Sequence, residues 1–135
     1  MGSLFSRIVA GEIPSFKVAE DDRFLAFLDI NPIAKGHTLV IPKEEMDYIF
    51  AIPDNTLADL FTFSKKVALA MGTVIPCKRI GIAVIGLEVP HAHIHLVPLQ
   101  TIYDIDFKKP KLKFSQEELS KITERISKAY RDQNA

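Results

Sequence analysis

The 135-residue chain is poor in cysteine and carries no excess of either charge. Its single cysteine, Cys77, has no partner for an internal disulfide. Lysine and arginine together number 17, as do aspartate and glutamate, so no overall field attracts nucleic acid or an anionic membrane. We therefore expect neither as a partner, and any recognition of phosphate has to be local.

Long hydrophobic runs and glycine-rich phosphate loops are also missing. Gly11, Glu12 and Pro14 interrupt the N-terminal segment, which argues against a signal peptide or a membrane span and predicts a cytoplasmic protein. Without a P-loop or dinucleotide fingerprint, kinase and Rossmann mechanisms have no support. Apolar residues make up 47% of the chain and charged residues 25%, an ordinary globular composition, and the length fits one domain over residues 1–135.

The hydrophobic pattern predicts an α+β domain with a mainly antiparallel sheet. Apolar runs between turn residues predict strands over residues 16–19, 24–29, 38–41 and 79–86. Helical periodicity predicts helices over residues 3–10, 54–72 and 115–131. The buried face of the helix at 54–72 is expected to consist of Leu57, Leu60, Phe61, Ser64, Val67, Ala68 and Met71. A capping box of Ser115 and Glu118 begins the C-terminal helix.

What the chain does have is a row of three histidines at alternate positions, His91, His93 and His95. In an extended strand this spacing places them on one face, about 6 to 7 Å from one to the next. A tight link over residues 87–90 would join this strand to its antiparallel neighbour. The interleaved residues then face a core: Ala92, Ile94 and Leu96.

Histidine is the side chain that can be nucleophile, proton donor or metal ligand near neutral pH. A purely structural role is a poor account of three in alternation, because adjacent imidazoles disfavour one another's charged forms. A zinc site is the rival interpretation, but parallel strand imidazoles do not easily converge on one ion. Instead, the middle imidazole, His93, can attack phosphorus, with a protonated neighbour, His95, stabilising the phosphate.

A basic segment surrounds Pro110. A solvated loop is the favoured interpretation, and an anion attractor at the mouth of the site is the alternative. Its members are Lys108, Lys109, Lys111 and Lys113.

The run from His91 to Val97 resembles the signature of the histidine-triad (HIT) superfamily, in the branch of small bacterial-type HIT hydrolases. The likeness continues in the same order through five further segments and covers about residues 3 to 99. They are LFSRI at 4–8, GEIP at 11–14, EDD at 20–22, FLAFLDINP at 24–32 and GHTLVIPK at 36–43.

The resemblance implies a HIT-like fold with about five mainly antiparallel strands and two main helices, in a homodimer that joins the two sheets. It implies that His93 becomes nucleotidylated, that His95 lies beside the α-phosphate, and that His91 and His37 support them. Asp29 matches the carboxylate that binds the ribose hydroxyls. The residues that match the apolar base pocket are Leu4, Phe5, Ile8, Phe27 and Ile30.

One departure concerns the loop before the histidines, where many relatives carry Gln followed by Ser or Thr and this chain has Leu87 and Glu88. The expected function is a purine nucleotide hydrolase or transferase that acts at the α-phosphate without metal or cofactor, on nucleoside phosphoramidates. A dinucleoside polyphosphate hydrolase is the alternative in the same class. A nucleotide-binding or scaffolding module with little turnover, favoured by the missing polar loop residues, and a zinc-binding protein are the alternatives in other classes.

Overall fold

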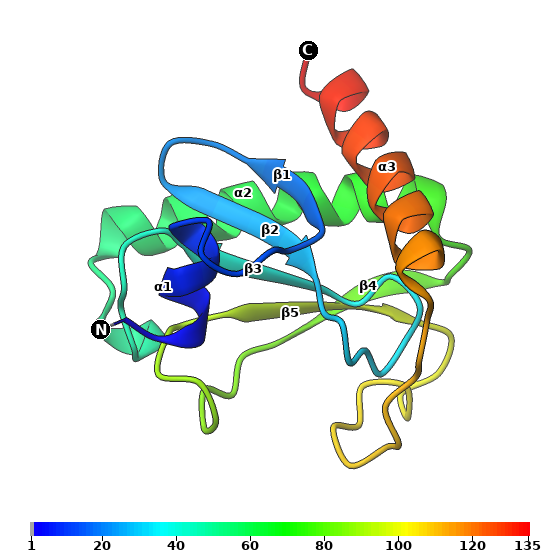
Figure 1. Cartoon of the computed structure of the whole chain (residues 1–135), viewed down its shortest axis with the longest axis horizontal. Coiled ribbons are helices and arrows are strands. Elements are labelled where there is room, and N and C mark those ends of the chain that lie inside the picture. Colours follow the sequence, from blue (N-terminus) through cyan, green and yellow to red (C-terminus); the bar gives the residue numbers. More distant parts are fainter. Residues whose placement is uncertain (1) are drawn as a thin grey trace.

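A computed structural model describes residues 2–135 as three α-helices, a 3-10 turn and five strands (Figure 1). In chain order the elements are α1 (Leu4–Val9), β1 (Lys17–Glu20), β2 (Phe24–Leu28), β3 (Thr38–Pro42), η1 (Ile49–Ala51), α2 (Asp54–Val74), β4 (Arg79–Ala83), β5 (Ile94–Leu99) and α3 (Gln116–Gln133). This confirms the expected α+β class and the two main helices, α2 and α3.

The five strands form one antiparallel sheet in the order β1-β2-β3-β5-β4. The β1–β2 hairpin turns where the Asp21 carboxylate accepts the backbone N–H groups of Arg23 and Phe24, each at 2.8 Å. Strand β5 lies between β3 and β4, with Ile94 opposite Val40. The inner position of β5 brings the residues before it next to β3, whose side chains are all buried.

The helices cover opposite faces of this sheet (Figure 1). On one face α2 and α3 enclose the larger core, to which β5 contributes Ile94 and Leu96 as predicted. On the other face α1 packs Phe5 and Ile8 against β2 and β3 in a smaller core. Alternate residues of the same strands therefore serve two separate cores.

Helix α2 differs from the prediction at its end and on its buried face. It continues past Gly72 to Val74, since Ile75 N–H still donates to the Met71 carbonyl at 2.8 Å. Phe61 was expected inside but is 38% exposed, and Phe63 packs in the core instead. Helix α3 begins as predicted at Ser115 with a complete capping box.

The predicted histidine strand is wrong in its extent. Strand β5 begins only at Ile94, and residues 84–93 form a long connection from β4 in place of a tight link. His91 and His93 lie on this connection, where Ala92 N–H donates to the Met46 carbonyl at 2.6 Å rather than to a neighbouring strand. This hydrogen bond, made two residues before Ile94, takes the place of strand pairing, so His91 and His93 lie outside the sheet.

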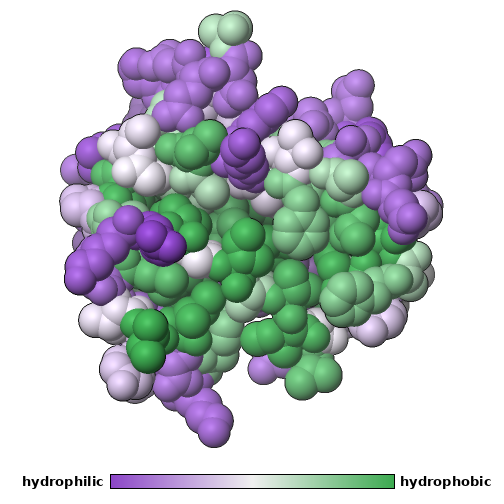
Figure 2. Space-filling model, turned by 180° about the vertical axis from the view of Figure 1, so that it is seen from behind, coloured by the Kyte–Doolittle hydropathy of each residue, from purple (hydrophilic) through white to green (hydrophobic). Residues whose placement is uncertain are grey.

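Much of the face opposite to that of Figure 1 is apolar, and hydrophilic side chains gather around its edges (Figure 2). Large exposed apolar residues of the chain include Tyr48, Phe50, Leu69, Ile82, Ile85 and Leu87. Across residues 2–135, none of the helices combines the length and the apolar character needed to cross a bilayer.

Candidate active site

All four histidines of the chain are buried and meet at the start of β5. His37 precedes β3, and its ring centroid lies 5.2 Å from that of His95. The His93 and His95 ring centroids are 4.9 Å apart. The structure thus adds His37, 54 positions before His91 in the sequence, to the predicted row.

His91 has hydrogen-bond partners on both ring nitrogens. Its Nε2 lies 2.7 Å from the Pro42 carbonyl, which can only accept, so Nε2 carries the proton. Its Nδ1 therefore accepts a hydrogen bond from the Ser3 hydroxyl at 3.0 Å. Ser6 donates its own hydroxyl to Glu45 at 2.7 Å, and Glu45 also accepts the Ser3 backbone N–H at 2.5 Å. This network fixes the tautomer of His91 and ties the first turn of α1 to it.

His93 is left with one free ring nitrogen. Its Nδ1–H donates to the His91 backbone carbonyl at 2.7 Å. In the neutral ring the lone pair then lies on Nε2, for which the described residues provide no hydrogen-bond partner. The Phe5 ring stands edge-on to His93, with centroids 5.0 Å apart. An unprotonated, uncommitted Nε2 is what a nucleophilic imidazole requires.

His37 and His95 share a proton, and the neighbouring backbone decides where it lies. His37 Nδ1 accepts the Ile33 backbone N–H at 3.2 Å, so the His37 proton is on Nε2. His37 Nε2–H then donates to His95 Nδ1 at 2.9 Å. His95 consequently carries its own proton on Nε2, as a donor available to a ligand. Asp29 lies beside this pair, with its Oδ2 3.8 Å from His37 Nε2.

Burial keeps this pair of histidines neutral. Desolvation, with the charges of His95, Lys111 and His93 added, lowers the pKa of His37 to about 3. Desolvation and the charges of His93 and Lys111 lower the pKa of His95 to about 4. The lowered pKa favours a neutral His95 at neutral pH over the protonated neighbour expected from the sequence, and leaves its Nε2–H as the available donor.

His91 and Asp29 experience opposing influences on their pKa values. Burial lowers the pKa of His91, while the Pro42 hydrogen bond and the Glu45 charge oppose that shift. Burial raises the pKa of Asp29, and the hydrogen bond from Asn31 N–H opposes it. Burial outweighs the opposing contacts in both cases, so the pKa of His91 is lowered and the pKa of Asp29 is raised.

The five residues expected at an apolar base pocket divide into two groups. Phe5, Ile8 and Phe27 are buried together in the smaller core, and the Phe5 and Phe27 ring centroids are 5.6 Å apart. Leu4 and Ile30 are 48% and 60% exposed. The buried members connect α1 to the histidines through Phe5, and the two exposed side chains are free to meet a ligand.

The HIT domain family model matches residues 10–102 of the chain. An adenosine 5′-monophosphoramidase of Schizosaccharomyces pombe is 37% identical over 130 residues, which cover 94% of this chain and 97% of that protein. The chain belongs to the histidine-triad (HIT) superfamily.

Solved HIT structures agree in fold over nearly the whole chain. A Hit-like protein from Bartonella henselae, described as involved in cell-cycle regulation, superposes with a TM-score of 0.83 at 30% identity, covering 94% of this chain and 95% of that one. A zinc-bound histidine triad family protein from Mycobacterium smegmatis gives 0.80 at 27% identity, covering 97% and 94%. The small bacterial-type HIT fold predicted from the sequence is thereby confirmed.

Two groups beside the HIT histidines were not identified from the sequence. One is the network of Ser3, Ser6 and Glu45, for which no motif gave a signal. The other is the pair Phe107 and Lys111, for which the basic segment gave a partial one. The Phe107 ring centroid lies 4.6 Å from that of His95.

One group of possible metal ligands occurs within residues 2–135, formed by Asp29, His37 and His95 with donor atoms all within 4.8 Å of one another. However, His37 Nε2 and His95 Nδ1 already share a proton at 2.9 Å, whereas a tetrahedral zinc ion holds its ligand atoms about 3.3 Å apart. An ion here would have to displace that proton. The hydrogen bond accounts for the close approach of the two rings without a metal.

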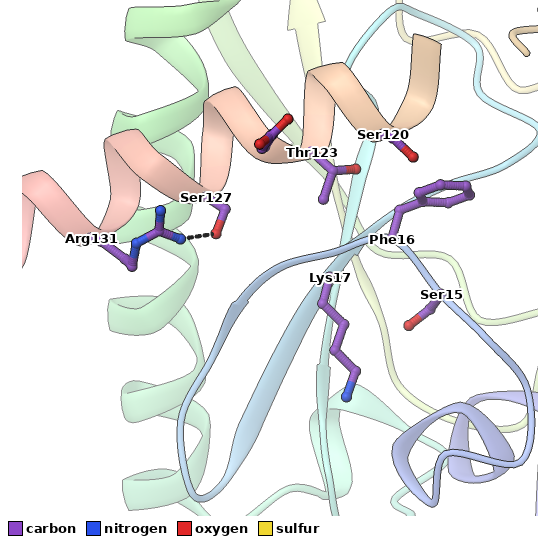
Figure 3. A pocket seen from close by; sticks show the side chains of 8 residues that line it. Ser15, Phe16, Lys17, Ser120, Thr123, Ser127 and Arg131 are labelled. Atoms are coloured by element: carbon purple, nitrogen blue, oxygen red, sulfur yellow. Dashed lines mark hydrogen bonds between the residues drawn. The ribbon is translucent and has the colours of Figure 1, made fainter. Parts of the chain in front are cut away.

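A separate hollow of about 380 Å³ lies between β1 and α3 (Figure 3). It contains none of the four histidines. Its two cations have partners, since Lys17 lies 3.8 Å from Glu20 and Arg131 donates to Ser127 at 2.7 Å. The hollow offers no group with the properties of His93, so the histidine cluster remains the candidate active site.

Proposed function

We propose that this HIT protein is a metal-independent hydrolase or transferase that acts at the α-phosphate of purine nucleotide conjugates, of the phosphoramidate type. The observation that carries this proposal is the pairing of a free His93 Nε2 with a His95 Nε2–H donor. The similarity to an adenosine 5′-monophosphoramidase supports the choice of leaving group.

In the proposed reaction His93 Nε2 attacks the α-phosphorus while the bond from phosphorus to the amine breaks. The amine takes its proton from solvent, and His95 Nε2–H stabilises the charge on the phosphoryl oxygens. The nucleotidylated imidazole keeps its Nδ1–H, which the His91 carbonyl accepts. Water then attacks the phosphorus, the bond from phosphorus to His93 Nε2 breaks with its electron pair going to the nitrogen, and a proton of the water returns to solvent; the nucleoside monophosphate and neutral His93 are released.

The nucleoside part is proposed to bind beside the histidines. The Asp29 carboxylate, 23% exposed at its side chain, can accept both ribose hydroxyls. The purine is proposed to lie against the base-pocket residues Leu4, Phe5, Ile8, Phe27 and Ile30. These roles rest on position and on the superfamily likeness, and variants of Asp29 test them directly.

The deciding experiment offers the protein a fluorogenic adenosine phosphoramidate and a diadenosine polyphosphate, each with and without chelator. We expect turnover of the phosphoramidate that chelator leaves intact and that His93→Gly removes. Binding of AMP without turnover of either substrate would instead identify a binding module. Loss of activity to chelator, with recovery on adding zinc, would contradict metal independence.

We also propose that two copies associate through the free edge of β4. This strand has a neighbour on one side only, and its Ile82 side chain is 53% exposed. An unpaired edge with apolar side chains favours pairing with another strand. Light scattering should give twice the chain mass, and Ile82→Lys should give a monomer. A wild-type monomer at high concentration would refute the proposal.

A further inference from the structure

The segment between β5 and α3 packs directly onto the histidines. The Phe107 ring stands edge-on to His95, with centroids 4.6 Å apart, and lies 6.2 Å from the His37 ring. Leu112 N–H donates to the Pro32 carbonyl at 2.8 Å, which anchors the segment to the loop that follows β2. Residues 107–112 therefore form one side of the site, which we call the arm.

The arm holds one lysine against the site. Lys111 Nζ donates to the Phe107 carbonyl at 3.3 Å and lies 5.7 Å from the centroid of the Phe107 ring. Within residues 2–135 no carboxylate lies within 4.0 Å of Lys111, whereas Lys109 has Asp104 at 3.9 Å. The Lys111 ammonium is thus exposed, without an acidic partner, and tied to a ring that touches His95.

The charge of Lys111 reaches the groups expected around the phosphate. Burial is the main cause of the lowered pKa values of His37 and His95, and the Lys111 charge adds to it; at Asp29 the same charge opposes the rise in pKa that burial causes. His37 and His95 are themselves neutral, so His95 contributes an N–H donor but neither ring contributes a positive charge. The positive charge available to an anion that binds beside His95 is therefore the Lys111 ammonium of the arm.

Resting on the proposed function, we infer that Lys111 binds the anionic oxygens of a phosphate leaving group and so adds activity on phosphoanhydrides, such as dinucleoside polyphosphates, to the phosphoramidate activity proposed above. In a phosphoanhydride the bond from the α-phosphorus to the bridging oxygen breaks as His93 attacks. The leaving phosphate keeps the electron pair and needs no proton, so a nearby ammonium stabilises it. An amine has to gain a proton when it leaves, and a cation beside it brings no such benefit.

The test compares Lys111→Gln, which removes the charge, with Lys111→Arg, which keeps it. Each variant is assayed on diadenosine tetraphosphate and on an adenosine phosphoramidate. We expect Lys111→Gln to lower the ratio of the two kcat/KM values, tetraphosphate over phosphoramidate, about tenfold. Lys111→Arg should restore most of that ratio. Lys113→Gln is the matched control, because it removes an exposed charge from the same basic segment, and it should leave the ratio within about twofold.

Equal losses on both substrates would overturn the inference, because Lys111 would then act on the shared α-phosphate or on the fold. An unchanged ratio would overturn it as well. If the wild-type protein turned over neither substrate, the proposed function would fail, and calorimetry with ADP and AMP would decide the role of Lys111 separately. Lys111→Gln should weaken ADP about tenfold more than AMP, and an unchanged ADP-to-AMP ratio would refute the role.

Discussion

The two ends of the histidine cluster are built differently. At one end His91 bonds to the Pro42 carbonyl and to Ser3, within a network that ends on the Glu45 carboxylate. At the other end His95 bonds to His37 and packs against Phe107, with the Lys111 ammonium close by. His93 lies between the two ends and takes its orientation from the His91 carbonyl.

This contrast separates two ways of controlling a buried imidazole. The charge of Glu45 opposes the desolvation that lowers the pKa of His91, whereas the charge of Lys111 adds to it at His95. One end thereby holds the His91 ring in place through the Pro42 carbonyl and the Ser3 cap of α1, and the other end keeps a neutral donor, His95, near a cation. We expect substitutions in the His91 network to make the orientation of His93 less well fixed. Substitutions on the His95 side should weaken substrate binding.

The largest effect is expected where the two ends meet. His93→Ala removes the attacking nitrogen, so kcat should fall by about a thousandfold or more while AMP affinity stays within about tenfold. Single-turnover kinetics and calorimetry measure the two quantities. If the variant kept more than about a tenth of kcat, the covalent mechanism would be wrong.

The next effect belongs to the His95 end. Asp29→Ala should weaken AMP about thirtyfold, because the ribose hydroxyls lose an acceptor, and should hardly change the affinity for 2′,3′-dideoxy-AMP. Calorimetry with both ligands is the measurement. Equal weakening of both would show that Asp29 supports the loop through its hydrogen bond with Asn31 N–H at 2.8 Å rather than the ligand.

A smaller effect is expected at the His91 end. Glu45→Ala removes the acceptor of Ser3 N–H and the Ser6 hydroxyl, and kcat/KM should fall about threefold because water replaces an exposed carboxylate easily. Glu45→Gln keeps an acceptor oxygen and should restore most of the activity. Glu44→Ala changes the neighbouring exposed carboxylate and is the matched control. An equal loss in Glu44→Ala would indicate a general effect of surface charge.

An effect of a different kind is a dependence of stability on pH. With folded-state pKa values of about 3 for His37 and about 4 for His95, against 6.5 for a free histidine, the unfolded chain binds more protons below pH 6.5. These two groups contribute nothing to the pH dependence above that value. Their contribution lowers the free energy of unfolding as pH falls from 6.5 toward 4.

Thermal unfolding between pH 7 and pH 4.5 measures this dependence. His37→Gln keeps a side-chain N–H and removes one titrating ring, so its Tm should fall less steeply with pH than that of the wild type. Parallel curves for the two proteins would mean that burial does not exclude the proton from His37.

Much of the fold could be predicted from local sequence pattern. Ala92, Ile94 and Leu96 do face the larger core, and the Ser115–Glu118 capping box does begin α3. Both features depend only on residues a few positions apart, the range over which hydrophobic periodicity and helix capping operate. The hydrophobic pattern could not predict that Phe63 rather than Phe61 is buried, because this depends on where α2 contacts β2 and α3.

The sequence by itself determined which side chains can do chemistry here, namely four histidines, and the superfamily to which their spacing belongs. Only the tertiary structure decided which nitrogen of each ring carries the proton. The tautomer of His91 follows from Pro42 and Ser3, and that of His95 follows from Ile33 through His37; these partners lie far from His91 and His95 along the chain. The arm is a similar case, since Phe107 reaches His95 only through the path of the segment after β5. Proton positions and local charge depend on distances through space, and local sequence pattern does not record those distances.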